Sequence, residues 1–207
     1  MNSHDSERIA GLLEKNGYLA AEAIADADLI IINTCSVREK AEEKLFAKIS
    51  EVKSKTGNKE PLIAVTGCVA QQEGENILKR STGVDLVVGT QALQNFPSLI
   101  EEAISTKTTQ IDINPYDDVS FPLGIAARSN PVKAYVTIIE GCNDFCSFCV
   151  VPYTRGNERM RRSAEILEEV RQAVKTGHRE IHLLGQIVNH YRDPGLPDHG
   201  FPELLEK

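Results

Sequence analysis

The chain has 207 residues, of which 41% are hydrophobic and 26% are charged, as is typical of a soluble globular protein. Its net charge of −7 at pH 7 argues against a nucleic-acid interface spread over the whole surface. No stretch approaches the roughly 18 consecutive apolar residues of a membrane span, and the amino end, MNSHDSERIA, lacks the layout of a secretory signal. We therefore expect a cytoplasmic protein that is not bound to a membrane.

The first part of the chain alternates helical and strand-like segments. Residues 4–16 have apolar side chains at helical spacing, and Gly17 is placed to end that helix. Asp28 to Ile32 is a short continuous apolar run, which is typical of a buried parallel strand. The pattern continues with a helix from Val37, a strand at 62–65, a helix at 71–80, a strand at 84–88 and a helix at 91–104. This alternation predicts an α/β fold with a parallel sheet and helices on its faces.

A segment with three prolines and no sustained period, residues 114–131, predicts a linker. We expect it to join an amino-terminal domain, residues 1–113, to a second domain, residues 132–207. In the second domain the alternation restarts with a strand at 132–139, a helix at 164–176 ended by Gly177, and a strand at 180–184. The last residues, FPELLEK, have the pattern of the start of another helix. So few strands cannot cover the faces and edges of a barrel or open sheet, so we interpret the chain as a fragment.

Three of the five cysteines form one motif. Cys142, Cys146 and Cys149 have the spacing C-x3-C-x2-C in EGCNDFCSFCVVPYTRG, directly after a predicted strand. Clusters that only transfer electrons normally take four cysteine ligands. Three thiolates this close together therefore predict a four-iron cluster with one iron left open for a substrate or cofactor. The alternatives are three inert cysteines or a zinc site with His178 or His182 as its fourth ligand.

The other two cysteines, Cys35 and Cys68, each follow a predicted strand. Ligand sites gather at the carboxyl ends of parallel strands, where loops of neighbouring units converge. The two residues could therefore meet as ligands, each just before a helix whose amino end favours a thiolate. Alternatively, each is a small buried core residue. An odd number of cysteines cannot all pair within one chain, and clustered cysteines in a reducing cytosol more often bind metal.

Further polar and aromatic residues lie near these cysteines in the sequence. Gln186 and Asn189 follow the strand at 180–184 and could hydrogen-bond a cofactor or a base. We expect Phe145 and Phe148 to pack around the cluster and exclude water, or to pack in an ordinary core, and we expect Thr34 to cap the helix after it. Four closely spaced arginines are candidates for phosphate contacts or for a solvated basic turn: Arg155, Arg159, Arg161 and Arg162.

The cysteine motif, with an aromatic residue before its last cysteine, resembles that of the radical S-adenosylmethionine superfamily. More closely, the chain resembles the tRNA methylthiotransferases of the MiaB type. The matching segments are spread over nearly the whole chain: MNSHDSERIAGLLEKNGY, ADLIIINTCSVREKAEEKLF, AVTGCVAQQEGE, VDLVVGT, EGCNDFCSFCVVPYTRG and LLGQIVNHY. The chain departs from the family in three places. It begins just after the family's first auxiliary cysteine, and it lacks the rest of the barrel and the RNA-binding β-domain that the family has. It also has Ile187 where asparagine is usual and RGNERMRR as a variant of the arginine-rich tail.

This resemblance implies an amino-terminal methylthiotransferase domain followed by the first strands and helix of a partial (β/α) radical SAM barrel. It implies two [4Fe-4S] clusters: Cys142, Cys146 and Cys149 hold the radical-generating one, to which S-adenosylmethionine binds, while Cys35 and Cys68 are two ligands of an auxiliary one. The implied reaction adds a methylthio group to C2 of an N6-isopentenyl-type adenosine next to the anticodon of tRNA. The implied partners are tRNA and a reducing electron donor such as flavodoxin or ferredoxin, and we expect a monomer.

Two alternatives to this function stay open at the level of sequence. One is a methylthiotransferase that acts on threonylcarbamoyl adenosine or on a ribosomal protein. The other is an iron–sulfur binding fragment without transferase activity. No residue pattern identifies a general acid, base or nucleophile, so the catalytic residues are unassigned.

Overall fold

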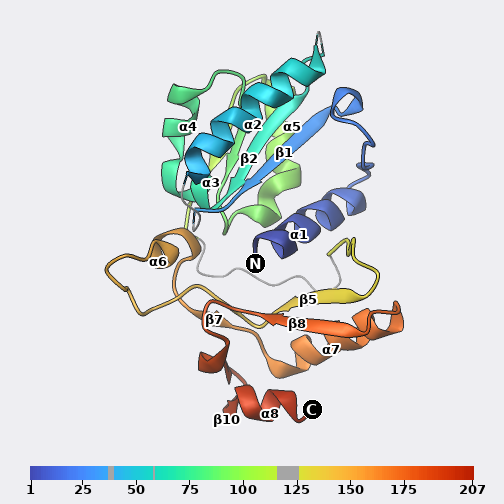
Figure 1. Cartoon of the computed structure of the whole chain (residues 1–207), viewed down its shortest axis with the longest axis vertical. Coiled ribbons are helices and arrows are strands. Elements are labelled where there is room, and N and C mark those ends of the chain that lie inside the picture. Colours follow the sequence, from blue (N-terminus) through green and yellow to red (C-terminus); the bar gives the residue numbers. More distant parts are fainter. Residues whose placement is uncertain (37–39, 58, 116–125) are drawn as a thin grey trace. The chain divides into compact units, whose positions relative to one another are not determined.

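The structure, a computed structural model, describes residues 1–36, 40–57, 59–115 and 126–207 (Figure 1). These residues group into two compact units. The first unit contains residues 12–115, and the second contains residues 3–11 and 126–207. Most of the predicted linker, residues 116–125, lies outside the described residues, so the predicted division into domains stays a prediction. None of the helices in the described part of the chain has the length and apolarity needed to cross a bilayer.

The first unit is built on a four-stranded parallel sheet in the order β1-β2-β3-β4. The strands are β1 (Leu29–Thr34), β2 (Leu62–Gly67), β3 (Leu86–Val88) and β4 (Gln110–Asp112). The register pairs Thr34 with Gly67, so β1 and β2 end on the same rung of the sheet. The sequence analysis missed β4, because three residues of mixed polarity carry no strand pattern of their own.

Helices cover this sheet (Figure 1). They are η1 (Ile24–Asp26), α2 (Ala41–Thr56), α3 (Cys68–Glu73), α4 (Glu75–Arg80), η2 (Leu93–Asn95) and α5 (Phe96–Thr106). The first helix, α1 (Asn2–Lys15), is divided between the two units, with residues 3–11 in the second. Leu45, Ile49 and Val52 form the apolar stripe of α2 and belong to the same buried core as Ile63 of β2. The helix predicted at 71–80 is divided into α3 and α4, because Gly74 between them has a φ of +48°. The predicted start of α2, Val37, lies outside the described residues.

The second unit continues the α/β pattern with shorter strands. Its elements are β5 (Lys133–Thr137), β6 (Ile139–Glu140), α6 (Val151–Arg155), β7 (Arg159–Met160), α7 (Ser163–Lys175), β8 (Glu180–Leu184), η3 (Val188–His190), β9 (Arg192–Asp193), β10 (Leu196–Gly200) and α8 (Phe201–Leu205). Strands β5 and β8 are parallel, whereas β6 and β7 are antiparallel. The strand predicted at 132–139 changes partner at Ile138, whose N–H donates to Leu184 on one side while its carbonyl accepts from Arg161 on the other.

The core of the second unit lies between these strands and the helices that follow them. Ile138, Ile139, Ile166 and Tyr191 are almost completely buried in one cluster. The Tyr191 hydroxyl donates to the carbonyl oxygen of Arg161 at 2.9 Å. The helix expected at FPELLEK forms as α8, so the predicted alternation of strands and helices is confirmed to the end of the chain.

Candidate functional site

Cys35 and Cys68 lie at the carboxyl edge of the sheet in the first unit. The last paired residues of β1 and β2 are Thr34 and Gly67, and each cysteine is the next residue in the sequence. Cys68 is buried and Cys35 is half-buried, and both are free thiols. Cys68 is the first residue of α3, whereas α2 begins only at Ala41. As expected, a helix follows each cysteine in the sequence; part of the segment between Cys35 and α2, residues 37–39, lies outside the described residues.

A hydroxyl group and a glycine bring these two strand ends together. Thr34 Oγ1 donates to the carbonyl oxygen of Thr66 at 2.6 Å and accepts from the N–H of Val69 at 3.2 Å. The prediction that Thr34 caps the helix after its own strand is therefore wrong, because its hydroxyl binds the first turn of the neighbouring helix α3. Gly67 has a φ of +91°, and a Cβ there would lie 2.9 Å from the backbone nitrogen of Thr34 and clash with its carbonyl oxygen. Only glycine permits this close approach.

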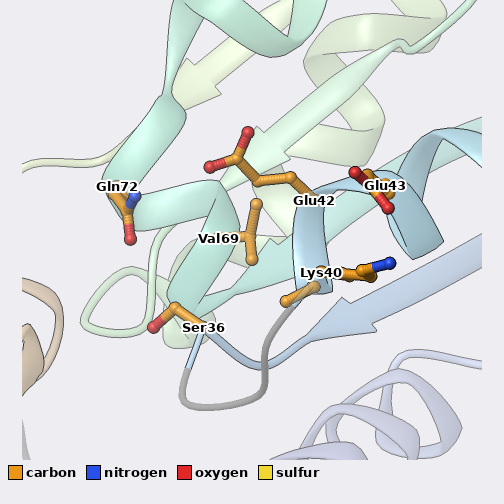
Figure 2. A pocket seen from close by; sticks show the side chains of 7 residues that line it. Ser36, Lys40, Glu42, Glu43, Val69 and Gln72 are labelled. Atoms are coloured by element: carbon orange, nitrogen blue, oxygen red, sulfur yellow. The ribbon is translucent and has the colours of Figure 1, made fainter.

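A pocket of about 380 Å³ lies near the carboxyl ends of β1 and β2 (Figure 2). Two of its lining residues, Ser36 and Val69, are the residues that follow Cys35 and Cys68 in the sequence. The rest of the lining comes from the amino end of α2 and from α3: Lys40, Ala41, Glu42, Glu43 and Gln72. Because most of these side chains are polar or charged, the pocket suits a small polar group.

Cys142, Cys146 and Cys149 lie on one loop of the second unit, between β6 and α6. Gly141 begins this loop with a φ of +82°, and a Cβ there would lie 2.6 Å from the carbonyl oxygen of Gly156. The N–H of Cys142 donates to the same oxygen at 3.2 Å, and the N–H of Cys149 donates to the carbonyl oxygen of Cys146 at 2.9 Å. Cys142 is buried, Cys149 is half-buried and Cys146 is exposed, all as free thiols. The cysteine loop is thus anchored at its base and open at its tip.

The donor set of this loop fits an iron–sulfur cluster in type and number, since such clusters are held by soft thiolates. Within the described ranges, however, no three histidine, cysteine, aspartate or glutamate side chains lie close enough together to hold a metal ion. Phe145, near the tip, has a φ of +45°, a conformation that costs a residue with a Cβ about 1–2 kcal/mol.

The aromatic side chains of the cysteine loop are exposed. Phe148 is 91% exposed. Phe145 is 55% exposed and packs edge-on against Tyr153, with 6.1 Å between the ring centroids. Ordinary core packing, one of the two expectations for the phenylalanines, is therefore wrong, whereas packing around a bound cluster stays a prediction.

Two of the four closely spaced arginines are buried in ion pairs. Arg155 contacts Glu140 at 2.9 Å and Asp5 at 2.5 Å, and its side chain is 3% exposed. Arg161 contacts Glu169 at 2.6 Å, and its side chain is 2% exposed. Both guanidinium groups thus bind carboxylates inside the protein, and we do not carry them forward as phosphate contacts.

The other two arginines lie closer to solvent. Arg162, the residue before α7, is exposed, and Arg159 is partly buried at 3.8 Å from Glu140. Neither side chain is enclosed as those of Arg155 and Arg161 are. A phosphate contact therefore stays a prediction for Arg159 and Arg162.

Gln186 lies at the same sheet edge as the cysteine loop. Strand β8 pairs with β5 so that Leu184 lies opposite Thr137, and both Gln186 and the loop follow this rung. Oε1 of Gln186 is buried and has no hydrogen-bond partner among the described residues. Because buried polar atoms normally have partners, this oxygen fits a role in holding a cofactor. Asn189, in η3, is exposed.

The two histidines considered as zinc ligands have contacts elsewhere. His178 is buried, and its Nδ1 lies 3.0 Å from the carbonyl oxygen of Ala173 in α7. His182 lies on β8, with its ring edge-on to Tyr135 at 5.5 Å between centroids. Neither histidine lies in a group of three or more possible metal ligands within the described part of the chain.

The sequence analysis missed two buried carboxylates that support this site. Glu140 follows Ile138 and Ile139, and Glu169 lies on the buried face of α7 with Ile166. A carboxylate in an otherwise apolar pattern is itself a signal, because burying it without a partner is costly. The sequence pattern therefore predicts that each carboxylate has a partner, but it does not reveal which arginine that partner is.

Two family models match the chain. Residues 1–89 match a family described as "Uncharacterized protein family UPF0004", and residues 136–196 match the "Radical SAM superfamily". The first segment contains Cys35 and Cys68, and the second contains Cys142, Cys146 and Cys149.

Curated relatives match the chain from end to end. The tRNA-2-methylthio-N(6)-dimethylallyladenosine synthase of Clostridium botulinum (strain Okra / Type B1) is 43% identical over 210 residues, covering 100% of this chain and 47% of the relative. The synthase of the same name from Koribacter versatilis (strain Ellin345) is 46% identical over 209 residues, covering 99% of this chain and 46% of the relative. The chain therefore spans about half the length of the curated relatives it matches.

Solved structures resemble the chain in fold. The radical S-adenosylmethionine methyltransferase TsrM from Kitasatospora setae, with tryptophan substrate and a SAM analog bound, has a TM-score of 0.61 at 13% identity, covering 91% of this chain and 46% of TsrM. At this identity the likeness concerns the fold alone, and it confirms the predicted α/β class with a partial radical SAM barrel. Taken together, the comparisons make the chain similar over its whole length to tRNA-2-methylthio-N(6)-dimethylallyladenosine synthases, with a segment that matches the radical SAM superfamily.

Proposed function

We propose that the chain acts in a radical SAM methylthiotransferase that modifies tRNA. The proposed reaction adds a methylthio group to C2 of an N6-isopentenyl-type adenosine next to the anticodon. The observation that carries this proposal is the cysteine loop, which presents three free thiols directly after a strand end. The curated names of relatives that match the whole chain support the same reaction.

The proposed cofactors are two [4Fe-4S] clusters and S-adenosylmethionine. Cys142, Cys146 and Cys149 would hold the radical-generating cluster, and Cys35 and Cys68 would be two ligands of the auxiliary cluster. When bound, a cluster with an open iron supplies one-electron reduction of S-adenosylmethionine, and the resulting radical chemistry reaches a C–H bond that acid–base catalysis cannot.

The residues around the cysteine loop have roles that follow from their positions. Oε1 of Gln186, which is buried without a hydrogen-bond partner among the described residues, would accept a hydrogen bond from an N–H or O–H group of the cofactor. The buried Ile138 and Ile139 keep water away from the base of the loop. Asn189, exposed just beyond the same strand end, is placed to bind the cofactor or the target base.

The proposed partners are tRNA and a small reductant. Arg162 and Arg159 would contact phosphate oxygens, which position a nucleic acid without reading its sequence. The exposed tip of the loop at Cys146 gives access to an electron donor such as flavodoxin or ferredoxin. We propose that the protein acts as a monomer in the cytoplasm.

Anaerobic reconstitution tests the cluster assignment. The chain is loaded with iron and sulfide, reduced with dithionite and mixed with S-adenosylmethionine, and iron, acid-labile sulfide and released deoxyadenosine are measured. We expect deoxyadenosine from the wild type, none from Cys146→Ala, and wild-type amounts from Ser147→Ala, a matched change in the same loop. Failure of the wild type to bind iron, or undiminished release by Cys146→Ala, would overturn the assignment.

Mass spectrometry of nucleosides tests the substrate. tRNA that carries N6-isopentenyladenosine is incubated with the reconstituted, reduced protein and then digested. We expect the methylthiolated nucleoside from this tRNA and not from tRNA that lacks the isopentenyl group. Modification of threonylcarbamoyl adenosine instead would support the first alternative, and cluster binding without any modified nucleoside would support an iron–sulfur fragment without transferase activity.

A further inference from the structure

Buried ion pairs close the base of the cysteine loop. Arg155, the last residue of α6, donates from Nη1 to Glu140 Oε1 at 2.9 Å and from Nη2 to Asp5 Oδ2 at 2.5 Å. Glu140 ends β6, two residues before Cys142. The three charged side chains are at most 4% exposed. The residues on either side of the loop, Glu140 and Arg155, are thus joined directly.

Most of the contacts at this base come from nearby in the sequence. Strands β6 and β7 pair Glu140 with Arg159, and the N–H of Glu158 donates to Asn143 Oδ1 at 3.0 Å. Asp5 differs, because it lies in the first turn of α1, 150 residues before Arg155. The amino-terminal helix therefore supplies one of the two carboxylates that hold the end of α6.

The charge balance makes Asp5 necessary for this geometry. Burial alone would raise the pKa of Asp5, but the charge of Arg155 and its hydrogen bond hold the pKa below its ordinary value. Asp5 is therefore ionised at neutral pH and attracts the guanidinium group. Asp5 also lies 3.9 Å from Arg8, and removing a buried carboxylate that binds arginine is destabilising because buried charges need partners. Without the Asp5 carboxylate, Arg155 would keep Glu140 but lose its second buried partner.

We propose that Asp5 is a positioning residue for the cysteine loop. Through Arg155 it holds the base of the loop in place, while Cys146 near the tip is exposed. The assignment of a cluster to this loop rests on the proposed function, whereas the mechanical role of Asp5 does not. Asp5 lies in the segment that matches UPF0004, so part of that segment is a structural component of the unit that carries the radical SAM cysteines.

Hydrogen exchange of the cluster-free chain tests this role without depending on activity. Asp5→Asn keeps the size of the side chain and removes its charge. Glu14→Gln makes the same chemical change at an exposed position of the same helix and is the matched control. Exchange is followed by mass spectrometry in peptides from the cysteine loop and α6, with α7 and β8 as references within the same unit.

We expect Asp5→Asn to speed exchange in residues 141–156 by about tenfold or more, since charged hydrogen bonds are among the strongest and local opening follows their loss. Exchange in α7 and β8 should change little, and Glu14→Gln should match the wild type throughout. Unchanged exchange at 141–156, or equal acceleration in α7 and β8, would overturn the positioning role. If Asp5→Asn does not fold, Arg155→Lys serves instead, because a lysine keeps the charge but cannot bind two carboxylates through two nitrogen atoms.

A spectroscopic measurement separates positioning from general stability. In a Cys35→Ala background, which confines the signal to the cysteine loop, the electron paramagnetic resonance spectrum of the reconstituted, reduced protein is recorded. Asp5→Asn should alter its line shape, and Glu14→Gln should not; identical spectra would contradict positioning of the cluster. If the wild-type chain binds no iron, the proposed function fails while the exchange result still decides the role of Asp5. If iron binds normally and exchange is unchanged, only the role of Asp5 fails.

Discussion

Gly67→Ala tests whether close contact of two strand ends sets the positions of Cys35 and Cys68. Gly67 is the last residue of β2, and its φ of +91° disfavours any residue with a Cβ. An added Cβ would also clash with the carbonyl oxygen of Thr34, which is backbone and cannot rotate away as a side chain would. The substitution therefore combines backbone strain with overpacking at the candidate site.

The two contributions can be estimated separately. A left-handed conformation costs a residue with a Cβ about 1–2 kcal/mol, and overpacking of a well-packed site costs about 1–3 kcal/mol. We expect Gly67→Ala to lower the free energy of unfolding by their sum, about 2–5 kcal/mol. Gly17→Ala is the matched control, because Gly17 has a φ of +86° and no atom within 4 Å of the added Cβ. It should lose only the strain, about 1–2 kcal/mol.

Urea unfolding followed by far-ultraviolet circular dichroism measures both variants against the wild type. Both glycines belong to the first unit, so the comparison concerns the same folding unit. A loss of stability in Gly67→Ala no larger than that in Gly17→Ala would refute the reasoning. The space beside Thr34 would then be able to accept a side chain, and the approach of the two strand ends would not depend on glycine.

Three further predictions concern the second unit. Gly141→Ala should destabilise it more than Gly177→Ala in thermal unfolding, since both residues have positive φ but only at Gly141 would a Cβ meet backbone atoms; equal losses would contradict this. Burial, and after it the charge of Arg8, lowers the pKa of His4 from 6.5 to about 3. Between these pH values His4 stays neutral in the folded state and takes up a proton in the unfolded state. The free energy of unfolding therefore falls as the pH drops below 6.5. His4→Gln should remove about 2 kcal/mol of the loss between pH 7.5 and pH 5 in urea unfolding, and an identical pH dependence in both proteins would rule this out. Glu169→Ala breaks two buried ion pairs, with Arg128 and Arg161, and should cost about 3–5 kcal/mol in urea unfolding, against less than about 1 kcal/mol for the partly exposed Glu168→Ala; similar costs would show that burial does not matter here.

The main features of the fold follow from local patterns in the sequence. Apolar runs at strand length and apolar stripes at helical spacing predicted β1, α2, β2, α7 and β8 near their observed positions, because these elements bury a continuous face. Short elements were missed. β4 and β7 are three and two residues long, and they are strands only because a neighbouring strand pairs with them.

The residues of the candidate site, too, were predictable where their pattern is local and unpredictable where their contacts are distant in the sequence. The motif of Cys142, Cys146 and Cys149 is local, so its spacing alone places three thiols on one loop. The positions of Cys35 and Cys68 after strands were also readable, because parallel strands end at one edge. The roles of the arginines were not readable, since four similar side chains within eight residues have different surroundings once the chain is folded.

The sequence by itself determined the α/β class, the cysteine motif and the likeness to methylthiotransferases, because these depend on residue types at short spacings. Only the tertiary structure decided that Arg155 binds Asp5, that the Thr34 hydroxyl binds the neighbouring helix, and that the strand before the cysteines changes partner at Ile138. The physical reason is that these contacts join segments far apart in the chain. Which polar groups become partners depends on which backbones the packed core brings together, and no local pattern records that outcome.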